Sequence, residues 1–149
     1  MFTGRQKEFA LLEETVKEPE NQIAVLYGRE GIGKTAFINE FAKNYKGFYY
    51  CARECSGLCQ KQFIKSECEG MKELEHCLTY SEIFAAICEN EALADKRKKS
   101  IIILDEFHYM FDLQEEFKEA LLTLCSYPHI FVVLMSSSVS WVENDMIIM

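Results

Sequence analysis

The stretch that decides the fold begins at Gly28 and reads Gly28-Arg29-Glu30-Gly31-Ile32-Gly33-Lys34-Thr35. It fits the P-loop pattern GxxxxGK(S/T), a glycine-rich turn whose backbone N–H groups surround phosphate oxygens. In this pattern the lysine reaches the terminal phosphates and the last hydroxyl binds Mg²⁺. We therefore predict that Lys34 acts in catalysis and that Thr35 is a metal ligand. The predicted phosphate-binding residues are Gly28, Arg29, Glu30, Gly31, Ile32, Gly33, Lys34, Thr35 and Ala36.

The segments on either side support this prediction. Ile23–Tyr27 is a short apolar run of the kind that forms a buried parallel strand. Behind the turn, apolar side chains recur at helical spacing at Phe37, Ile38, Phe41 and Ala42. A helix that begins there adds its partial positive charge and free N–H groups to the phosphate site. A chance match in a surface turn would not explain the order of strand, turn and helix.

The second motif reads Ile101-Ile102-Ile103-Leu104-Asp105-Glu106 and fits the Walker B pattern, an apolar strand that ends in acids. Charged residues also follow ordinary buried strands, so the motif gains its weight from the P-loop upstream. Asp105 is predicted to hold Mg²⁺, directly or through water, and Glu106 to orient and polarise the attacking water. P-loop GTPases and many small-molecule kinases lack such a glutamate, and the chain has no Asn-Lys-x-Asp guanine-reading motif. The motifs together predict hydrolysis of ATP.

A further apolar run, residues 129–135, leads into Ser136-Ser137-Ser138. In ATPases of this class, a strand at this point of the chain lies between the P-loop strand and the Walker B strand. Hydroxyls at its tip would face the γ-phosphate and the water, which is the usual place of a sensor 1 residue. We assign this role to Ser137, with Ser136 as the alternative. Ordinary turn chemistry at a strand end explains the serines equally well.

These motifs, together with the N-terminal stretch Phe2-Thr3-Gly4-Arg5-Gln6-Lys7-Glu8 before an amphipathic helix, resemble the archaeal-type ATPase domain. This family is an AAA+-related branch close to the signal-transducing NTPases, and the resemblance spans nearly the whole chain. It implies that the Gly-Arg segment lies by the adenine, so Gly4 and Arg5 are candidate contacts to the base. From the residues alone, Arg5 is equally a surface residue beside the helix start.

The chain departs from such relatives at its end and in its arginines. Relatives commonly continue into a fifth strand, a helical lid with an arginine sensor and a winged-helix region, whereas this sequence stops at Met149. We therefore expect one domain over residues 1–149 that is incomplete at its C-terminus. The arginines are Arg5, Arg29, Arg53 and Arg97, and none is recognisable as an arginine finger. Slow hydrolysis, low ATP affinity and self-association through an open strand edge are the expected consequences.

The expected fold is α/β, a three-layer P-loop NTPase core without its fifth strand and lid. Its parallel sheet is predicted in the order 2-3-4-1, with helices on both faces. The predicted strands are Gln22–Tyr27, Phe48–Ala52, Ser100–Leu104 and Ile130–Met135. The predicted helices are Lys7–Lys17, Lys34–Tyr45, Tyr80–Ala94 and Leu113–Cys125, with a mobile or helical cysteine-containing stretch after the second strand.

Composition agrees with a single cytoplasmic domain. The 149 residues are 49% hydrophobic, which is enough for one core, and the chain has neither a signal peptide pattern nor an apolar run long enough for a membrane span. The formal net charge of −8 argues against a broad nucleic-acid surface. The basic run Lys96-Arg97-Lys98-Lys99 is interpreted as a solvated loop near a helix C-terminus.

The cysteines and histidines are assigned no chemistry. Cys51, Cys55 and Cys59 recur every fourth residue, but CxxC pairs and the iron-sulfur spacing CxxxCxxC are absent. We interpret the cysteines as small buried hydrophobes, with zinc binding or redox chemistry as the alternative. His108, just past Glu106, is interpreted as a loop or helix-start residue, because Glu106 already serves as the base.

Three functions remain compatible with the sequence. The leading one is an ATPase core that binds Mg-ATP and hydrolyses it through Glu106. Self-association or a partner protein is compatible with this function. A nucleotide-gated switch with little turnover is favoured by the missing lid and arginine. A P-loop phosphotransferase with a small acceptor is disfavoured by Glu106.

Overall fold

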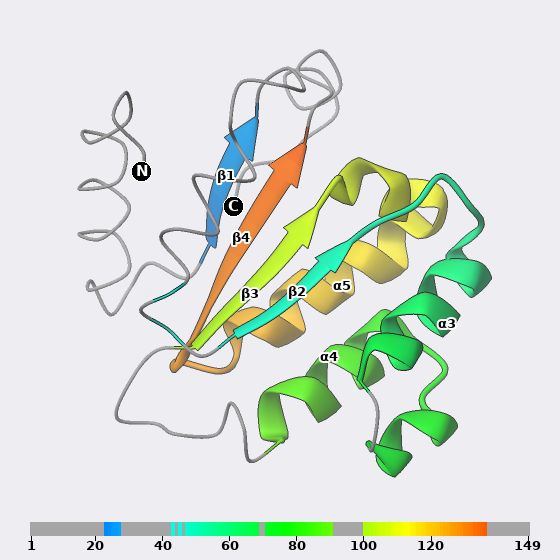
Figure 1. The fold of residues 1–149 in the computed structure, drawn as a ribbon, viewed down its shortest axis with the longest axis horizontal. Coiled ribbons are helices and arrows are strands. Elements are labelled where there is room, and N and C mark those ends of the chain that lie inside the picture. Colours follow the sequence, from blue (N-terminus) through cyan, green and yellow to red (C-terminus); the bar gives the residue numbers. More distant parts are fainter. Residues whose placement is uncertain are drawn as a thin grey trace.

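The computed structural model describes residues 23–27, 43, 45, 47–68, 71–90 and 100–136. Its centre is a parallel sheet of four strands in the order β1-β4-β3-β2 (Figure 1). The strands are β1 (Ile23–Tyr27), β2 (Gly47–Cys51), β3 (Ser100–Asp105) and β4 (Ile130–Ser136). This order is the predicted 2-3-4-1 counted from the opposite edge, so the predicted α/β fold class is confirmed.

At most of the strand ends, the observed bound differs from the predicted bound by one residue. β2 begins at Gly47, and β3 and β4 extend to Asp105 and Ser136. Gly47 suits the ladder because a Cβ there would lie 2.6 Å from the carbonyl oxygen of Ile101 on β3. Asp105 and Ser136 are polar, yet they belong to the strands because the ladder is made by backbone groups.

The described helices lie between the strands in sequence and on one face of the sheet (Figure 1). They are α3 (Gly57–Glu67), α4 (Tyr80–Glu89) and α5 (Gln114–Cys125), with the 3-10 helices η1 (Lys72–His76) and η2 (Phe107–Leu113). The prediction of helices on the other face concerns residues outside the described ranges. α5 runs along one face of the sheet, α4 packs against α5, and α3 lies beside α4 (Figure 1). The predicted helix Leu113–Cys125 is confirmed as α5. The helix predicted to reach Ala94 ends earlier, at Glu89, because Asn90 has an extended backbone.

The helical spacing of apolar residues explains why α4 and α5 pack together. α4 buries Tyr80, Ile83, Phe84, Ile87 and Cys88, and α5 buries Phe117, Ala120, Leu121 and Leu124. These sets recur every third or fourth residue, so each helix presents one apolar face. Thr79 begins α4 as its N-cap, since its hydroxyl oxygen accepts a hydrogen bond from the Glu82 N–H at 3.1 Å.

β3 and β4 are buried over their whole lengths, as expected of central strands in a parallel sheet. Ile102, Leu104, Val132 and Leu134 share the core with α4 and α5. Side chains alternate along a strand, so Ile101, Ile103, Asp105, Phe131, Val133 and Met135 lie on the opposite face, and all of them are buried. The site residue Asp105 therefore belongs to the face that α5 does not cover.

α3 was not predicted as a defined helix. Its buried face contains a polar residue, and two of its large apolar residues are exposed. Its buried residues are Gly57, Gln60 and Ile64. Leu58 and Phe63 are exposed, with 70% and 37% of their surfaces accessible. Because the buried face of α3 includes a polar glutamine, the apolar residues of this segment do not recur at clear helical spacing.

Several predicted segments lie outside the described residues. These are the helix Lys7–Lys17, the P-loop, the basic run and the C-terminal residues after Ser136. Of the predicted helix Lys34–Tyr45, the structure describes Lys43 in a turn and Tyr45 in a bend, so these two residues are not helical as predicted. Within the described ranges, no helix combines the length and the apolar character that a bilayer span needs.

Candidate active site

The last residues of β1 and β3, which lead into the P-loop sequence and the Glu106 turn, lie at the same end of the sheet. In the register between β1 and β4, Tyr27 pairs with Ser136. In the register between β3 and β4, Asp105 pairs with Met135. Tyr27 directly precedes Gly28, so the P-loop sequence starts one strand away from the end of the Walker B strand. The carboxyl edge of an open parallel sheet is where ligands bind in α/β folds.

Asp105 is held at this edge with little solvent contact. Its surface is 5% exposed, and its Oδ2 accepts a hydrogen bond from the hydroxyl of Tyr49 at 2.6 Å. Tyr49 comes from the neighbouring strand β2 and lies on the same face of the sheet. Burial, and then the hydrogen bond to Asp105, raise the pKa of Tyr49, so this hydroxyl keeps its proton and acts as a donor. The pairing fixes one carboxylate oxygen of Asp105.

Glu106 follows Asp105 in a left-handed backbone conformation. Its φ is 54° and its ψ is 39°, and it is the one non-glycine residue with positive φ in the described ranges. For a residue with a Cβ this conformation costs about 1–2 kcal/mol, and such backbone strain is frequent at functional sites. The conformation turns the chain sharply from β3 into η2, where the Tyr109 N–H donates to the Glu106 carbonyl oxygen at 3.1 Å.

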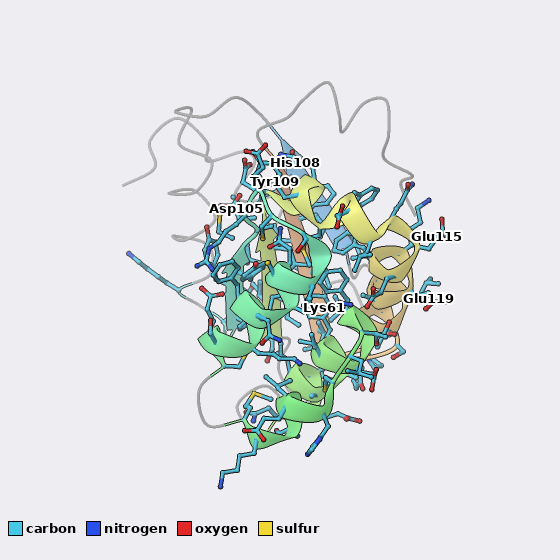
Figure 2. All side chains as sticks on the ribbon, turned by 90° about the vertical axis from the view of Figure 1, so that its right-hand side faces the viewer. Lys61, Asp105, His108, Tyr109, Glu115 and Glu119 are labelled. Carbon is cyan, nitrogen blue, oxygen red and sulfur yellow. The ribbon has the colours of Figure 1, made fainter. Side chains whose placement is uncertain are left out.

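The end of β4 is joined to η2 by a side-chain hydrogen bond. Ser136 Oγ lies 2.8 Å from Nδ1 of His108, and Ser136 is fully buried. The ring of His108 lies against that of Tyr109, with 4.2 Å between centroids. Figure 2 shows Asp105, His108 and Tyr109 at the same end of the molecule. His108 was expected in a loop or helix start, and its position in η2 agrees with that.

Sequence comparison adds the family to this geometry. Residues 2–147 match the family described as an ATPase domain predominantly from Archaea. The chain belongs to this family. The resemblance inferred from the motifs is therefore confirmed, and it covers nearly the whole of this ATPase domain.

Individual relatives agree with the family. An uncharacterized ATP-binding protein of Methanocaldococcus jannaschii is 39% identical over 46 residues, which are 31% of this chain and 78% of that protein. A Walker-type ATPase of Pyrococcus abyssi has a similar structure, with a TM-score of 0.71 and 20% identity, over 96% of this chain and 47% of that one. The ORC1 protein of Aeropyrum pernix, solved in complex with DNA, gives a TM-score of 0.64 and 22% identity over 97% of this chain and 41% of its own.

The similarity to the two solved structures establishes the fold of this ATPase domain. The chain spans less than half the length of either structure. At these identities the likeness concerns the fold alone. Over the aligned residues, both neighbours share the fold of this chain.

Gln60 is a residue of the site region that the sequence did not reveal. It is fully buried on α3 and connects the segment after β2 with η2. Its Oε1 accepts from the Arg53 N–H at 3.2 Å and from the Tyr50 hydroxyl, and its Nε2 donates to the carbonyl oxygens of Arg53 and Tyr109. Asp112 adds a second connection, because its Oδ2 accepts from the Gly57 N–H at 2.9 Å. These bonds join sequence positions too far apart for any local pattern to predict.

The donor set of the site is compatible with Mg²⁺. Asp105 offers a buried carboxylate at the edge where the P-loop sequence begins. Mg²⁺ prefers oxygen ligands and is usually held by one or two carboxylates with substrate phosphates, rather than by a cage of protein groups. Among the described residues there is no cluster of three or more His, Cys, Asp or Glu side chains that would form such a cage. Asp105 therefore fits the part of a single protein carboxylate in a magnesium site.

The remaining predicted site residues lie outside the described residues. They are Gly28, Arg29, Glu30, Gly31, Ile32, Gly33, Lys34, Thr35 and Ala36 of the P-loop, Gly4 and Arg5, and the sensor candidate Ser137. Their roles remain predictions. Ser136, the alternative sensor, shares the face of Leu134 and contacts His108, whereas Asp105 lies on the opposite face.

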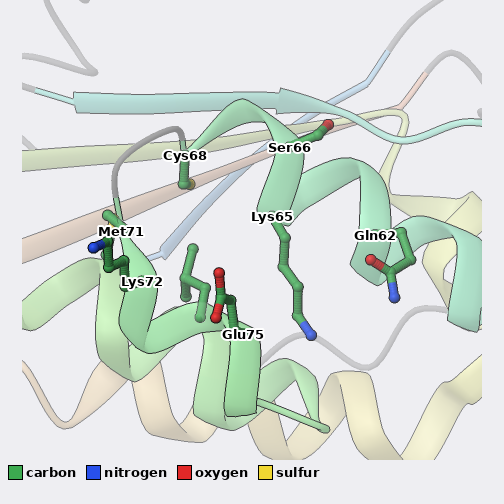
Figure 3. A pocket seen from close by; sticks show the side chains of 8 residues that line it. Gln62, Lys65, Ser66, Cys68, Met71, Lys72 and Glu75 are labelled. Atoms are coloured by element: carbon green, nitrogen blue, oxygen red, sulfur yellow. The ribbon is translucent and has the colours of Figure 1, made fainter.

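A separate cavity lies at the far end of α3 from the carboxyl edge. Its volume is about 700 Å³, and it is lined by residues of α3 and η1, including Lys65, Cys68, Lys72 and Glu75 (Figure 3). Lys65 is already engaged, since its Nζ donates to the carbonyl oxygen of Cys77 at 2.7 Å. The cavity shares no residue with the strand ends, so we do not associate it with the nucleotide.

The interpretation of the cysteines as small buried hydrophobes is confirmed for Cys77 and Cys88 and is wrong for Cys51 and Cys59, which are exposed. All seven are free. Burial raises the pKa of Cys88 to about 12 and that of Cys68 to about 11, which keeps both thiols protonated at neutral pH. Cys51 ends β2 beside Asp105, and burial and then the charge of Asp105 raise its pKa. In Cys51, Cys68 and Cys88 the raised pKa disfavours the nucleophilic thiolate.

Proposed function

We propose that this ATPase domain binds Mg-ATP at the carboxyl edge of its sheet and hydrolyses it. One observation supports this most directly. The strand registers set Tyr27, the last residue before the P-loop sequence, and Asp105, the Walker B aspartate, at neighbouring strand ends on either side of β4. This is the arrangement that a phosphate loop and a metal-binding carboxylate need in order to share one nucleotide.

The relatives support ATP as the nucleotide. The family is one of ATPase domains, and the relative from Methanocaldococcus jannaschii is named as an ATP-binding protein. The sequence reasoning is independent of these names, because Glu106 and the lack of a guanine-reading motif favour ATP over GTP.

In the proposed reaction the side chains have separate tasks. Lys34 and the backbone of residues 28–36 bind the phosphates, and Asp105 with Thr35 would hold Mg²⁺, which neutralises charge on the phosphates when bound. The carboxylate of Glu106 accepts a hydrogen bond from a water molecule and takes its proton. The water oxygen forms a bond to the γ-phosphorus, and the bond from that phosphorus to the bridging oxygen breaks, which gives ADP and phosphate. Ser137, or Ser136, would contact the γ-phosphate.

The buried surroundings of Asp105 favour this chemistry. Charges interact more strongly where water is excluded, and Asp105 is 5% exposed. Its hydrogen bond to Tyr49 orients the carboxylate from the side of β2. The left-handed backbone of Glu106 turns the chain out of β3 directly after Asp105. The turn therefore occurs at the residue that carries the proposed catalytic carboxylate.

The test separates binding from turnover. Lys34→Ala should abolish ATP binding measured by calorimetry, whereas Lys72→Ala, at an exposed position on η1, should leave it unchanged. Glu106→Gln should keep ATP binding but lower phosphate release by about 10²-fold or more, because the amide does not accept the proton. Glu115→Gln, at an exposed carboxylate on α5, is the matched control for the loss of charge.

Two results would contradict the proposal. Unchanged ATP affinity in Lys34→Ala would remove the P-loop from the site. Equal turnover in the wild type and Glu106→Gln would favour the nucleotide-gated switch, in which hydrolysis is incidental.

Asp105→Asn is expected to weaken only the Mg²⁺-dependent part of ATP binding.

A further inference from the structure

The hydrogen bond between His108 and Ser136 connects the turn that carries Glu106 with the end of β4. In the proposed reaction these two segments must keep fixed positions relative to each other. We propose that His108 is a positioning residue, which holds the turn carrying Glu106 against the end of β4 so that the Glu106 carboxylate stays aligned with the γ-phosphate. This inference rests on the proposed function. It assigns to His108 a role distinct from proton transfer, which Glu106 performs.

The distances place His108 where it can do this. Its Nδ1 lies 2.8 Å from Oγ of Ser136, the last residue of β4, and Ser136 is fully buried. Ser136 in turn pairs with Tyr27, directly before the P-loop sequence. This side-chain bond therefore connects η2, which follows directly after Glu106, with β4, whose neighbour β1 leads into the P-loop sequence.

The backbone of Glu106 explains why such a connection matters. A left-handed conformation at a glutamate is maintained only where surrounding contacts fix it. On one side of the turn, the Asp105 carbonyl oxygen accepts from the Ala52 N–H at 2.8 Å. On the other side, Phe107 is buried and stacks on Phe117 of α5, with 6.2 Å between ring centroids. His108 adds a hydrogen bond toward the end of β4.

A small displacement of Glu106 would affect turnover more than binding. The reacting water must lie in line with the γ-phosphorus, and a misplacement of about 1 Å can cost up to about 10²-fold in rate. ATP affinity depends mainly on the phosphate loop and the metal. Loss of the His108 bond is therefore expected to lower kcat and to leave ATP binding nearly intact.

The experiment compares variants that keep or lose this bond in the full chain. His108→Asn retains a polar group near the position of Nδ1, whereas His108→Leu keeps the volume but makes no hydrogen bond. Ser136→Ala removes the same bond from the other side. The exposed His76 on η1 provides the control variant His76→Leu. ATP affinity, kcat under saturating Mg-ATP and melting temperature are measured for each variant and for the double variant His108→Leu with Ser136→Ala.

We expect kcat to fall by about tenfold or more in His108→Leu, to recover largely in His108→Asn, and to be unchanged in His76→Leu. ATP affinity should stay within about twofold of the wild-type value. The double variant should lose no more than the worse single variant, because both changes remove one interaction. If His108→Leu fails to fold, His108→Ala takes its place, with a kcat loss expected in His108→Ala that His108→Asn largely recovers.

Three outcomes overturn the inference and leave the proposed function standing. These are unchanged kcat in both His108→Leu and Ser136→Ala, equal losses of kcat in His108→Asn and His108→Leu, and losses that add in the double variant. A wild-type chain that binds ATP but shows no turnover overturns the hydrolysis proposal itself and this inference with it. The wild-type measurement thus separates the two failures.

Discussion

The hydroxyl of Tyr49 donates a hydrogen bond to Oδ2 of Asp105 over 2.6 Å, from one strand to the next at the carboxyl edge of the sheet. The two residues are 56 positions apart in sequence. Tyr49 itself is 39% exposed, whereas Asp105 is 5% exposed. A partly exposed tyrosine on the outer strand β2 thus orients the buried carboxylate of Asp105, which we propose binds Mg²⁺.

Replacement of Tyr49 tests this orientation. Tyr49→Phe keeps the ring but removes the donor, and a hydrogen bond to a charged group contributes about 1.5–3 kcal/mol. Because Tyr49 is partly exposed, we expect the lower part of this range, seen as an increase of about tenfold in the Mg²⁺ concentration needed for half-maximal ATP binding. A magnesium titration at fixed ATP measures it. Tyr127→Phe is the control, since the Tyr127 hydroxyl contacts Glu89 at the other end of the sheet. Equal magnesium dependence in the wild type and Tyr49→Phe would contradict this role.

The backbone of Glu106 leads to a prediction about stability. Glu106→Asn and Glu106→Gln both remove the charge and should both lose turnover, but asparagine tolerates the left-handed conformation better than glutamine. The free energy of unfolding of Glu106→Asn should therefore exceed that of Glu106→Gln by about 0.5–1 kcal/mol. Denaturant unfolding of the two variants measures the difference. A lower stability of the asparagine variant would show that side-chain contacts of residue 106 outweigh its backbone strain.

Gln60 should contribute strongly to stability. Gln60→Leu keeps a side chain of similar length but leaves the buried polar partners of Gln60 without their bonds, which costs about 1–3 kcal/mol for each unsatisfied group. We expect a loss of at least about 2 kcal/mol in the free energy of unfolding. The neighbouring Gln62 is exposed, so Gln62→Leu should change stability by less than about 0.5 kcal/mol. Similar stabilities of the two variants would show that the Gln60 network is not a structural connection.

Alkaline pH should destabilise the fold through its buried thiols. Burial raises the pKa of Cys88 to about 12 from an ordinary value of 9.0. Above pH 9 the unfolded chain loses this proton before the folded chain does, so the unfolded state binds fewer protons and stability falls with rising pH. The contribution is fully present below pH 9 and is lost as the pH approaches 12.

Cys88→Ala should show a smaller loss of unfolding free energy between about pH 8 and about pH 10 than the wild type, although its stability at neutral pH is lower. Cys59→Ser, at an exposed thiol on α3, should keep the wild-type slope. Parallel pH profiles of the wild type and Cys88→Ala would indicate that this thiol is not protected by burial.

The strands and their order were predictable because they depend on local apolar runs and on a topology common to one fold class. The runs before Asp105 and Ser136 are continuous and buried on both faces, so neither turn signals nor polar residues interrupt them. The family resemblance then determined the order of the strands in the sheet. Only the ends shifted, because the backbone ladder includes the polar residues at the strand tips.

α3 and the contacts of the site were not predictable for a different reason. Gln60 is buried because its partners come from Tyr50, Arg53 and Tyr109, and no pattern within α3 indicates them. The bond from Tyr49 to Asp105 and that from His108 to Ser136 likewise join separate elements. The left-handed conformation of Glu106 has no sequence signal, since glycine or asparagine is the usual residue there.

The place of β2 in the sheet has one more consequence. It is an outer strand, paired with β3 alone among the described strands, and outer strands open locally more easily than central ones. The bond from Tyr49 to Asp105 exists only while β2 is paired. If a cation binds Asp105 as we propose, local opening of β2 is thermodynamically linked to its binding. Amide hydrogen exchange along β2 should therefore slow when Mg-ATP binds, whereas exchange in β3 and β4 stays slow throughout. Hydrogen exchange in the outer strand β2 would then indicate whether nucleotide is bound, although the central strands do not move.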